Sequence, residues 1–176
     1  MIDGVLEEIA IVFICLVVSG FFTALEMAFV SVPKPELRRL VREQHKDAKI
    51  LLRFRENPER TLSIIQIGIT VVGAIAAAVG GVGATKHLKP VLMEKLDITD
   101  IAASVLAIFF VVVPLTYVNV VFGELVPKTL ALRNPTKIAL SGIGFLRVAE
   151  RVISPVASFL EWSTKMVRSE ERRVGK

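Results

Sequence analysis

Apolar residues dominate three long stretches of the chain, and charged residues separate them. The stretches cover residues 9–31, 61–85 and 101–122, and each is long enough for a helix to cross the hydrocarbon core of a bilayer. Pro33 marks the end of the first stretch, and Asn57 with Pro58 marks a helix start before the second. The pattern therefore predicts an all-α integral membrane protein with three transmembrane helices.

The charged segments between these stretches differ in net charge. Residues 33–60 carry an excess of Lys and Arg over Asp and Glu, whereas the charges of residues 86–100 nearly cancel in a short connection. Because Lys and Arg near span ends mark the cytoplasmic side, the N-terminus is expected outside and the C-terminus in the cytoplasm. We expect His45 and His87 to be exposed surface residues of these segments.

After residue 136 the pattern changes from a lipid span to an amphipathic one. Leu146, Ala149 and Ile153 form an apolar face opposite Arg147 and Arg151. Residues 137–168 are therefore expected to form juxtamembrane helices in the interface, bent near the single proline of the segment. Residues 169–176 are basic and soluble, and we interpret them as a truncated linker toward a cytosolic domain that these 176 residues do not include.

Composition agrees with a membrane protein. Hydrophobic residues make up 53% of the chain, and the mean hydropathy is +0.61. The net charge of +5 comes from basic residues beside apolar segments, so it predicts membrane topology and not nucleic-acid binding. A lone Cys15 and two separated histidines exclude a disulfide framework and a zinc site within a single motif.

Polar residues recur at helical spacing inside the first two spans. Ser19, Thr23 and Glu26 are four and three residues apart, so they share one face of the first helix. In the second span, a further polar or close-packing face is predicted from Ser63, Gln66, Thr70 and Gly73. Such faces point toward other helices because lipid cannot satisfy their hydrogen bonds.

The end of the third span holds the most unusual group of residues. Glu124 is expensive to place near hydrocarbon, so it is a functional hypothesis that needs a partner. Pro127 has no N–H, which releases the carbonyl of Gly123 if the helix continues, and Pro114 is expected to kink the helix in mid-span. Lys128 lies four residues after Glu124, so an ordinary ion pair remains the alternative reading of that carboxylate.

Three segments resemble the transmembrane domain of the CorC/cyclin-M (CNNM) magnesium transporters. They are SGFFTALEMAFVS at 19–31, NPERTLSIIQIGIT at 57–70 and VFGELVPKTLALRNP at 121–135, in the family's order over nearly the whole chain. FGELVPK is the most specific of them. The second block departs from the common pattern, because Ile69 and Thr70 stand where the family often has two asparagines, so no role is assigned to these two residues.

The resemblance implies a homodimer in the cell membrane (inner or plasma membrane), with three spans and a belt of juxtamembrane helices per subunit. Residues 1–136 would form the ion-transport core. The transported ion would be Mg²⁺, with export and Na⁺ coupling as the family associations. Cytosolic CBS domains, which bind ATP in this family, normally follow in cis and are not part of these residues, so no nucleotide binding is expected.

A magnesium site needs oxygen ligands in near-octahedral geometry and usually keeps some water. On that chemistry, Glu124 is the expected charged ligand and Ser19 the expected hydroxyl ligand. Thr23 and Glu26 are candidates for a vestibule or a second ion site, and Lys128 for an interfacial anchor or counter-charge. The neutral oxygen donors are left open among Ser63, Gln66 or Asn119 and the carbonyls of Gly20, Gly68 or Gly123.

The sequence leaves two other classes of function to consider. The first is a magnesium-sensing or scaffold module that regulates another transporter without moving ions itself. The second is an intramembrane enzyme, which is disfavoured because no Ser/His, Asp/Asp or Cys/His group converges in the sequence.

Overall fold

Every element of the computed structural model is a helix within the part of the chain that the structure describes, which is the backbone of residues 2–174 and the side chains of residues 4–160, 162 and 163. The all-α prediction is confirmed. In chain order the elements are α1 (Ile2–Ser31), α2 (Lys34–Arg42), α3 (Lys46–Glu56), α4 (Pro58–Gly83), η1 (Ala84–Leu88), α5 (Lys89–Leu96), α6 (Asp100–Val118), η2 (Asn119–Leu125), α7 (Val126–Arg133), α8 (Pro135–Ser141) and α9 (Ile143–Val174). The two elements named η are π-helices.

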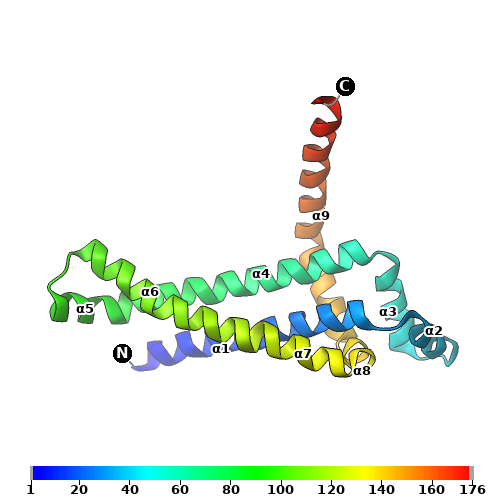
Figure 1. Ribbon diagram of the computed structural model, residues 1–176, viewed down its shortest axis with the longest axis horizontal. Coiled ribbons are helices and arrows are strands. Elements are labelled where there is room, and N and C mark those ends of the chain that lie inside the picture. Colours follow the sequence, from blue (N-terminus) through cyan, green and yellow to red (C-terminus); the bar gives the residue numbers. More distant parts are fainter. Residues whose placement is uncertain (1, 175–176) are drawn as a thin grey trace.

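Three helical stretches are long and apolar enough to cross a membrane: Gly4–Ser31, Pro58–Leu96 and Asp100–Arg133. They contain the three predicted spans and run along one another in Figure 1. The second stretch is longer than predicted, because the short connection expected at residues 86–100 is largely helical, as η1 and α5. Pro90 lies in the first turn of α5, where its missing N–H is tolerated. Asp97 ends that helix in the left-handed conformation, at φ 47°.

Helix α1 packs closely on α4 because small residues meet large ones there. A Cβ atom placed on Gly68 of α4 would lie 2.5 Å from Cζ of Phe22 on α1, so only glycine fits beneath that ring. Gly142, just after α8, receives Leu25 of α1 in the same way. Close approach through small residues is the usual basis of helix association in membranes, where the hydrophobic effect between helices is missing.

The short helices gather at the end of the bundle away from α5 and the N-terminus (Figure 1). Leu37 of α2 and Leu51 of α3 are each 1% exposed and belong to one apolar cluster with the end of α1. The guanidinium of Arg55 donates to the Val32 carbonyl at 2.6 Å, which joins α3 to the end of the first span. Pro58 begins α4 as predicted, although the Asn57 side chain makes no capping hydrogen bond.

Helix α9 crosses the direction of the spans and extends away from them (Figure 1). Of the predicted apolar face, Leu146 and Ala149 are buried and Ile153 is half-buried, whereas Val156 and Leu160 further along the helix are exposed. The helix continues through Pro155 to Val174, so residues 169–174 of the expected linker are helical. Their role as a linker stays a prediction, and residues 175–176 lie outside the described part of the chain.

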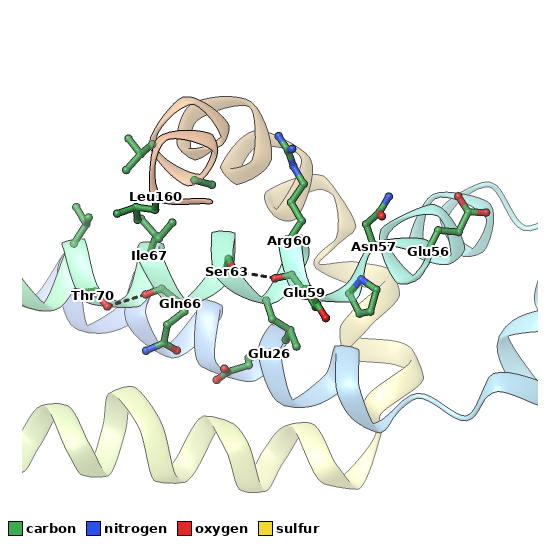
Figure 2. A pocket seen from close by; sticks show the side chains of 15 residues that line it. Glu26, Glu56, Asn57, Glu59, Arg60, Ser63, Gln66, Ile67, Thr70 and Leu160 are labelled. Carbon is green, nitrogen blue, oxygen red and sulfur yellow. Dashed lines mark hydrogen bonds between the residues drawn. The ribbon is translucent and has the colours of Figure 1, made fainter. Parts of the chain in front are cut away.

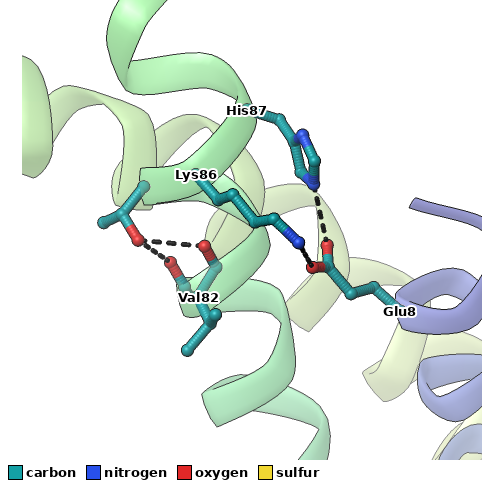
Figure 3. Close-up of polar contacts among 6 residues, drawn as sticks. Glu8, Val82, Lys86 and His87 are labelled. Carbon is teal, nitrogen blue, oxygen red and sulfur yellow. Dashed lines mark hydrogen bonds and ion pairs between the residues drawn. The ribbon is translucent and has the colours of Figure 1, made fainter. Parts of the chain in front are cut away.

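An ionic cluster joins α1 to η1 at the other end of the bundle (Figure 3). The Glu8 carboxylate lies 3.6 Å from Lys86 Nζ and 3.5 Å from His87 Nε2. Gly83 leaves room for this carboxylate, since a Cβ there would lie 2.5 Å from Glu8 Oε2. The prediction that His87 is an exposed surface residue was wrong: its side chain is 25% exposed, because the N-terminal part of α1 covers it. His45 is exposed, as predicted.

Candidate cation site between the first and third spans

The two uncharged residues of the polar stripe on α1 are buried. Ser19 is 1% exposed and Thr23 is 0% exposed, while Glu26 is half-buried. Neither the Ser19 hydroxyl nor the Thr23 hydroxyl has a hydrogen-bond partner among the described residues. Burying a hydroxyl without a partner costs about 1–3 kcal/mol, so each such group calls for a water, an ion or another ligand.

Other hydroxyls of the spans behave differently. Thr70 donates to the Gln66 carbonyl at 2.8 Å, and Thr116 donates to the Val112 carbonyl at 2.7 Å, each one turn back along its own helix. This local bond is the ordinary way for a helical Ser or Thr to satisfy itself in an apolar place. Ser19 and Thr23 do not form it, which leaves their oxygens available to a ligand.

The third span meets α1 through the π-helix η2, which ends at Leu125, two residues before Pro127. The Val126 N–H donates to the carbonyl of Val121, five residues back. The Phe122 carbonyl would accept from Val126 in the four-residue register and from Pro127 in the five-residue register. The Val126 N–H is used by Val121 and Pro127 has no N–H, so the Phe122 carbonyl lacks a helical donor. The sequence predicts a freed carbonyl at Gly123, which lies four residues before Pro127. In the five-residue register of the π-helix the carbonyl opposite Pro127 is that of Phe122, which sequence reasoning missed.

Two glycines bring the freed carbonyl next to α1. A Cβ on Gly20 would lie 3.5 Å from the Phe122 oxygen and 3.2 Å from Cγ of Pro127, so α1 and η2 touch through backbone atoms. Gly123 faces α1 in turn, with its Cβ position 3.5 Å from Cδ1 of Leu16. The pair Gly20 and Gly123 therefore lets backbone oxygens of the third span approach the helix that carries Ser19.

Helical rotation places Ser19 in the seam between α4 and η2. Phe22 faces α4 and Leu16 faces η2, and at about 100° per residue Ser19 lies about 60° from each of them. Thr23 lies one turn further along, closer to the direction of Leu16. The two hydroxyls without partners thus point into the region where the first, second and third spans meet.

Glu124 is adjacent to this seam but is not enclosed by it. Its carboxylate lies 3.9 Å from Lys128 Nζ, and the two side chains are 38% and 39% exposed. This is the i,i+4 pair that the sequence left open as the alternative. This distance is longer than a charge-assisted hydrogen bond, so the carboxylate oxygens stay available to another cation.

The remaining candidate ligands divide between two places. Asn119 Oδ1 would lie 2.8 Å from a Cβ on Gly123, so this amide covers the glycine beside Glu124, and Gly68 is buried beneath Phe22. Ser63 and Gln66 are exposed, away from the seam, on an open groove of about 1380 Å³ that Glu26 also lines (Figure 2). The Ser63 hydroxyl donates to the Glu59 carbonyl at 2.9 Å. The structure does not bring these two side chains to Ser19, and their role as ligands stays a prediction.

The described side chains include no group of three or more His, Cys, Asp or Glu arranged to hold a metal. The seam instead holds two hydroxyls and a backbone carbonyl, with the Asn119 amide over Gly123 and the Glu124 carboxylate turned to Lys128. Neutral oxygens with a single carboxylate suit a hard cation that keeps part of its water, and they do not suit a tightly held transition metal.

Three spanning helices with partnerless hydroxyls held between them define a multi-pass membrane domain with a polar interior. The family comparison agrees, because residues 10–173 match the family described as "Cyclin M transmembrane N-terminal domain". This chain belongs to that family.

Curated relatives cover most of the chain. A UPF0053 protein of Synechocystis, sll0260, is 33% identical over 160 residues, which are 91% of this chain and 36% of that protein. The UPF0053 inner membrane protein YfjD of Escherichia coli is 26% identical over 85% of this chain and 32% of its own length. A polyamine export protein of Haemophilus influenzae is 24% identical over 81% of this chain and 33% of its own length. The chain therefore spans about a third of the length of these relatives.

Proposed function

We propose that this domain carries Mg²⁺ across the membrane and binds it in the seam between α1 and η2. Ser19 and Glu124 would be its side-chain ligands, and the freed carbonyls of Phe122 and Gly123 its backbone ligands. The observation that carries the proposal is the pair of buried hydroxyls without partners on α1, beside a carbonyl that Pro127 leaves without a donor.

The proposed site must change between an empty and a loaded form. In the structure Glu124 is paired with Lys128, so loading requires the carboxylate to turn from Lys128 toward the seam. The Glu124 and Lys128 groups lie 3.9 Å apart, so the turn breaks no short charge-assisted hydrogen bond. Lys128 would then neutralise Glu124 whenever the ion has left, which keeps an unpaired charge out of the membrane.

The open groove lined by Glu26 lies at the end of the bundle that carries the basic helices, and neither Ser19 nor Glu124 lines it. The cluster of Glu8, Lys86 and His87 joins α1 to η1 at the opposite end. Transport would consist of exposing the site to each end in turn. Export as the direction, and Na⁺ as the coupling ion, are proposed from the family resemblance alone.

Flux measurements in liposomes test the proposal. With Mg²⁺ on one side and a magnesium-sensitive dye on the other, Ser19→Ala and Glu124→Gln are expected to lower the initial rate at least about ten-fold, as loss of a ligand does. Ser104→Ala is the matched control for serine, since that hydroxyl bonds its own helix at the Asp100 carbonyl. Glu94→Gln is the control for charge. Unchanged flux in both site variants would remove this site from the mechanism.

Related measurements distinguish Mg²⁺ transport from two alternative functions. If the protein binds Mg²⁺ without moving it, the domain is a sensing or scaffold module.

A polyamine is a second candidate substrate, because one relative is named a polyamine export protein. A polyamine carries several separated charges, so it would engage Glu124 and Glu26 together, whereas a single Mg²⁺ would not need Glu26. Polyamine flux that is abolished by Glu26→Gln, with no Mg²⁺ flux, would favour that substrate.

We further propose that the domain works as a homodimer, with the N-terminus outside and the C-terminus in the cytoplasm. Large apolar side chains of the third span, such as Phe109, Phe110 and Tyr117, are more than half exposed and would face lipid or a second copy. Mass measurement of the intact protein released from detergent tests the dimer. Labelling of cysteines introduced at Glu94 and Arg133 by an impermeant reagent tests the orientation, since only the first should react from outside.

A further inference from the structure

A pocket of about 530 Å³ lies between α3, α4 and α9. Ionisable side chains converge on it from all three helices. They are the arginines Arg53, Arg60 and Arg147 and the acids Glu56 and Glu150. Among the residues that line the pocket, the three guanidinium groups outnumber the two carboxylates, and Asp47 outside the pocket offsets one of them at Arg147.

The arginines retain donors for a ligand. Arg60 uses Nη2 to donate to Ser154 Oγ at 2.6 Å, which leaves the other N–H groups of its guanidinium. Arg147 forms an ion pair with Asp47 through Nη2 at 3.7 Å, which leaves the other N–H groups of its guanidinium. Arg53 is exposed and has no partner among the described residues. None of the three forms an ion pair with Glu56 or Glu150 in the part of the chain that the structure describes. The guanidinium groups are therefore positioned around the pocket without being neutralised by its acids.

The pocket lies at the beginning of the second span, where a bilayer would place its lipid headgroups. Arg60 directly precedes the apolar part of the second span, and its side chain extends toward α9 in Figure 2. Helix α9 crosses the direction of the spans at the same end of the bundle (Figure 1). Basic pockets between helices at the cytoplasmic membrane surface are typical sites for anionic lipid headgroups, which reach them from the surrounding bilayer.

We propose that this pocket binds the phosphate of an anionic lipid headgroup, such as that of phosphatidylglycerol. The planar forks of Arg53, Arg60 and Arg147 match phosphate oxygens. Glu56 and Glu150 would accept hydrogen bonds from the hydroxyl groups of the glycerol headgroup. A bound lipid would thereby hold α3 and α9 against the beginning of α4.

Native mass spectrometry of the full chain tests the proposal. The protein in detergent is mixed with phosphatidylglycerol, phosphatidylethanolamine or phosphatidylcholine at equal concentration, and the ratio of lipid-bound to lipid-free protein is measured. We expect phosphatidylglycerol to bind best. Arg53→Ala is expected to lower its ratio about five-fold, since each arginine near an anionic surface contributes about that factor. Arg60→Lys, which keeps the charge and loses the fork, should also lower it.

Matched variants separate a defined pocket from diffuse charge. Arg133→Ala removes an exposed arginine at the same end of the bundle and should leave the ratio unchanged. Equal loss in Arg133→Ala and Arg53→Ala would overturn the pocket. Phosphatidylethanolamine binding as tightly as phosphatidylglycerol would overturn the anionic headgroup. Displacement of the lipid by millimolar inorganic phosphate, in an Arg53-dependent manner, would assign the pocket to a soluble phosphate group instead.

Discussion

Two buried threonines of equal size should respond in opposite ways to the same substitution. Thr23 is 0% exposed and Thr61 is 3% exposed. The Thr61 hydroxyl lies 3.0 Å from the Phe54 carbonyl and 3.1 Å from the Asn57 carbonyl, and donates to them. The Thr23 hydroxyl has no partner among the described residues. Replacement of each by valine keeps the shape and removes only the hydroxyl, so the pair isolates the effect of hydrogen bonding.

The expected magnitudes follow from the cost of an unsatisfied buried group. Without divalent cations, Thr23→Val removes an uncompensated hydroxyl and should raise the free energy of unfolding by about 1–3 kcal/mol. Thr61→Val removes a satisfied hydroxyl and leaves the Phe54 carbonyl short of a donor, so it should lower the free energy of unfolding by about 1–3 kcal/mol. A stability gain from loss of a polar group indicates a site kept for a ligand.

Titration with sodium dodecyl sulfate in mixed micelles, followed by far-UV circular dichroism, measures both changes. Mg²⁺ should then stabilise the wild type, because only the folded protein assembles the site, and Ser19→Ala should lose most of that gain. Loss of stability of similar size in both valine variants would refute the reasoning, since it would mean that the Thr23 hydroxyl is satisfied in the folded protein.

Three further substitutions test the contacts that position the site. Gly68→Ala should lower the free energy of unfolding by about 1–3 kcal/mol, because its Cβ would overlap the Phe22 ring; in the same assay Gly73→Ala, which meets nothing within 4 Å, should not destabilise. Glu8→Gln should change the free energy of unfolding by only about 0–1 kcal/mol. It should also speed hydrogen exchange in η1, and unchanged exchange would mean that the ionic cluster does not hold η1 against α1. Pro127→Ala restores an N–H donor to the third span, so it should lower Mg²⁺ flux while the protein still folds; full flux would remove the freed carbonyls from the site.

The sequence predicts the fold well because long apolar stretches leave few options in a bilayer. The three spans and the start of α4 at Pro58 follow directly from hydropathy and proline placement. The polar stripe of α1 is also confirmed as a buried face at Ser19 and Thr23, because a spacing of four residues fixes a shared face whatever the neighbours are.

The rest of the site depends on how the helices are rotated about their axes, and hydropathy does not determine that in a membrane. Lipid-facing and protein-facing positions are equally apolar, so the sequence could not tell that Gln66 and Ser63 are exposed on the groove while Gly68 packs under Phe22. The missing donor of the Phe122 carbonyl could not be predicted from the sequence, because it depends on the π-helix before Pro127. The helical connection through η1 was missed because its mixed charges resemble those of a loop.

The most direct test of the cation site is an experimental structure of the protein with Mn²⁺ in place of Mg²⁺, located by its anomalous scattering. We predict one peak in the seam between α1 and η2, with the Ser19 hydroxyl and a Glu124 carboxylate oxygen at coordination distance, about 2.1 Å for Mg²⁺ itself. In that structure Glu124 would have turned away from Lys128. A seam without a peak, with the Ser19 hydroxyl bonded to its own helix, would contradict the account.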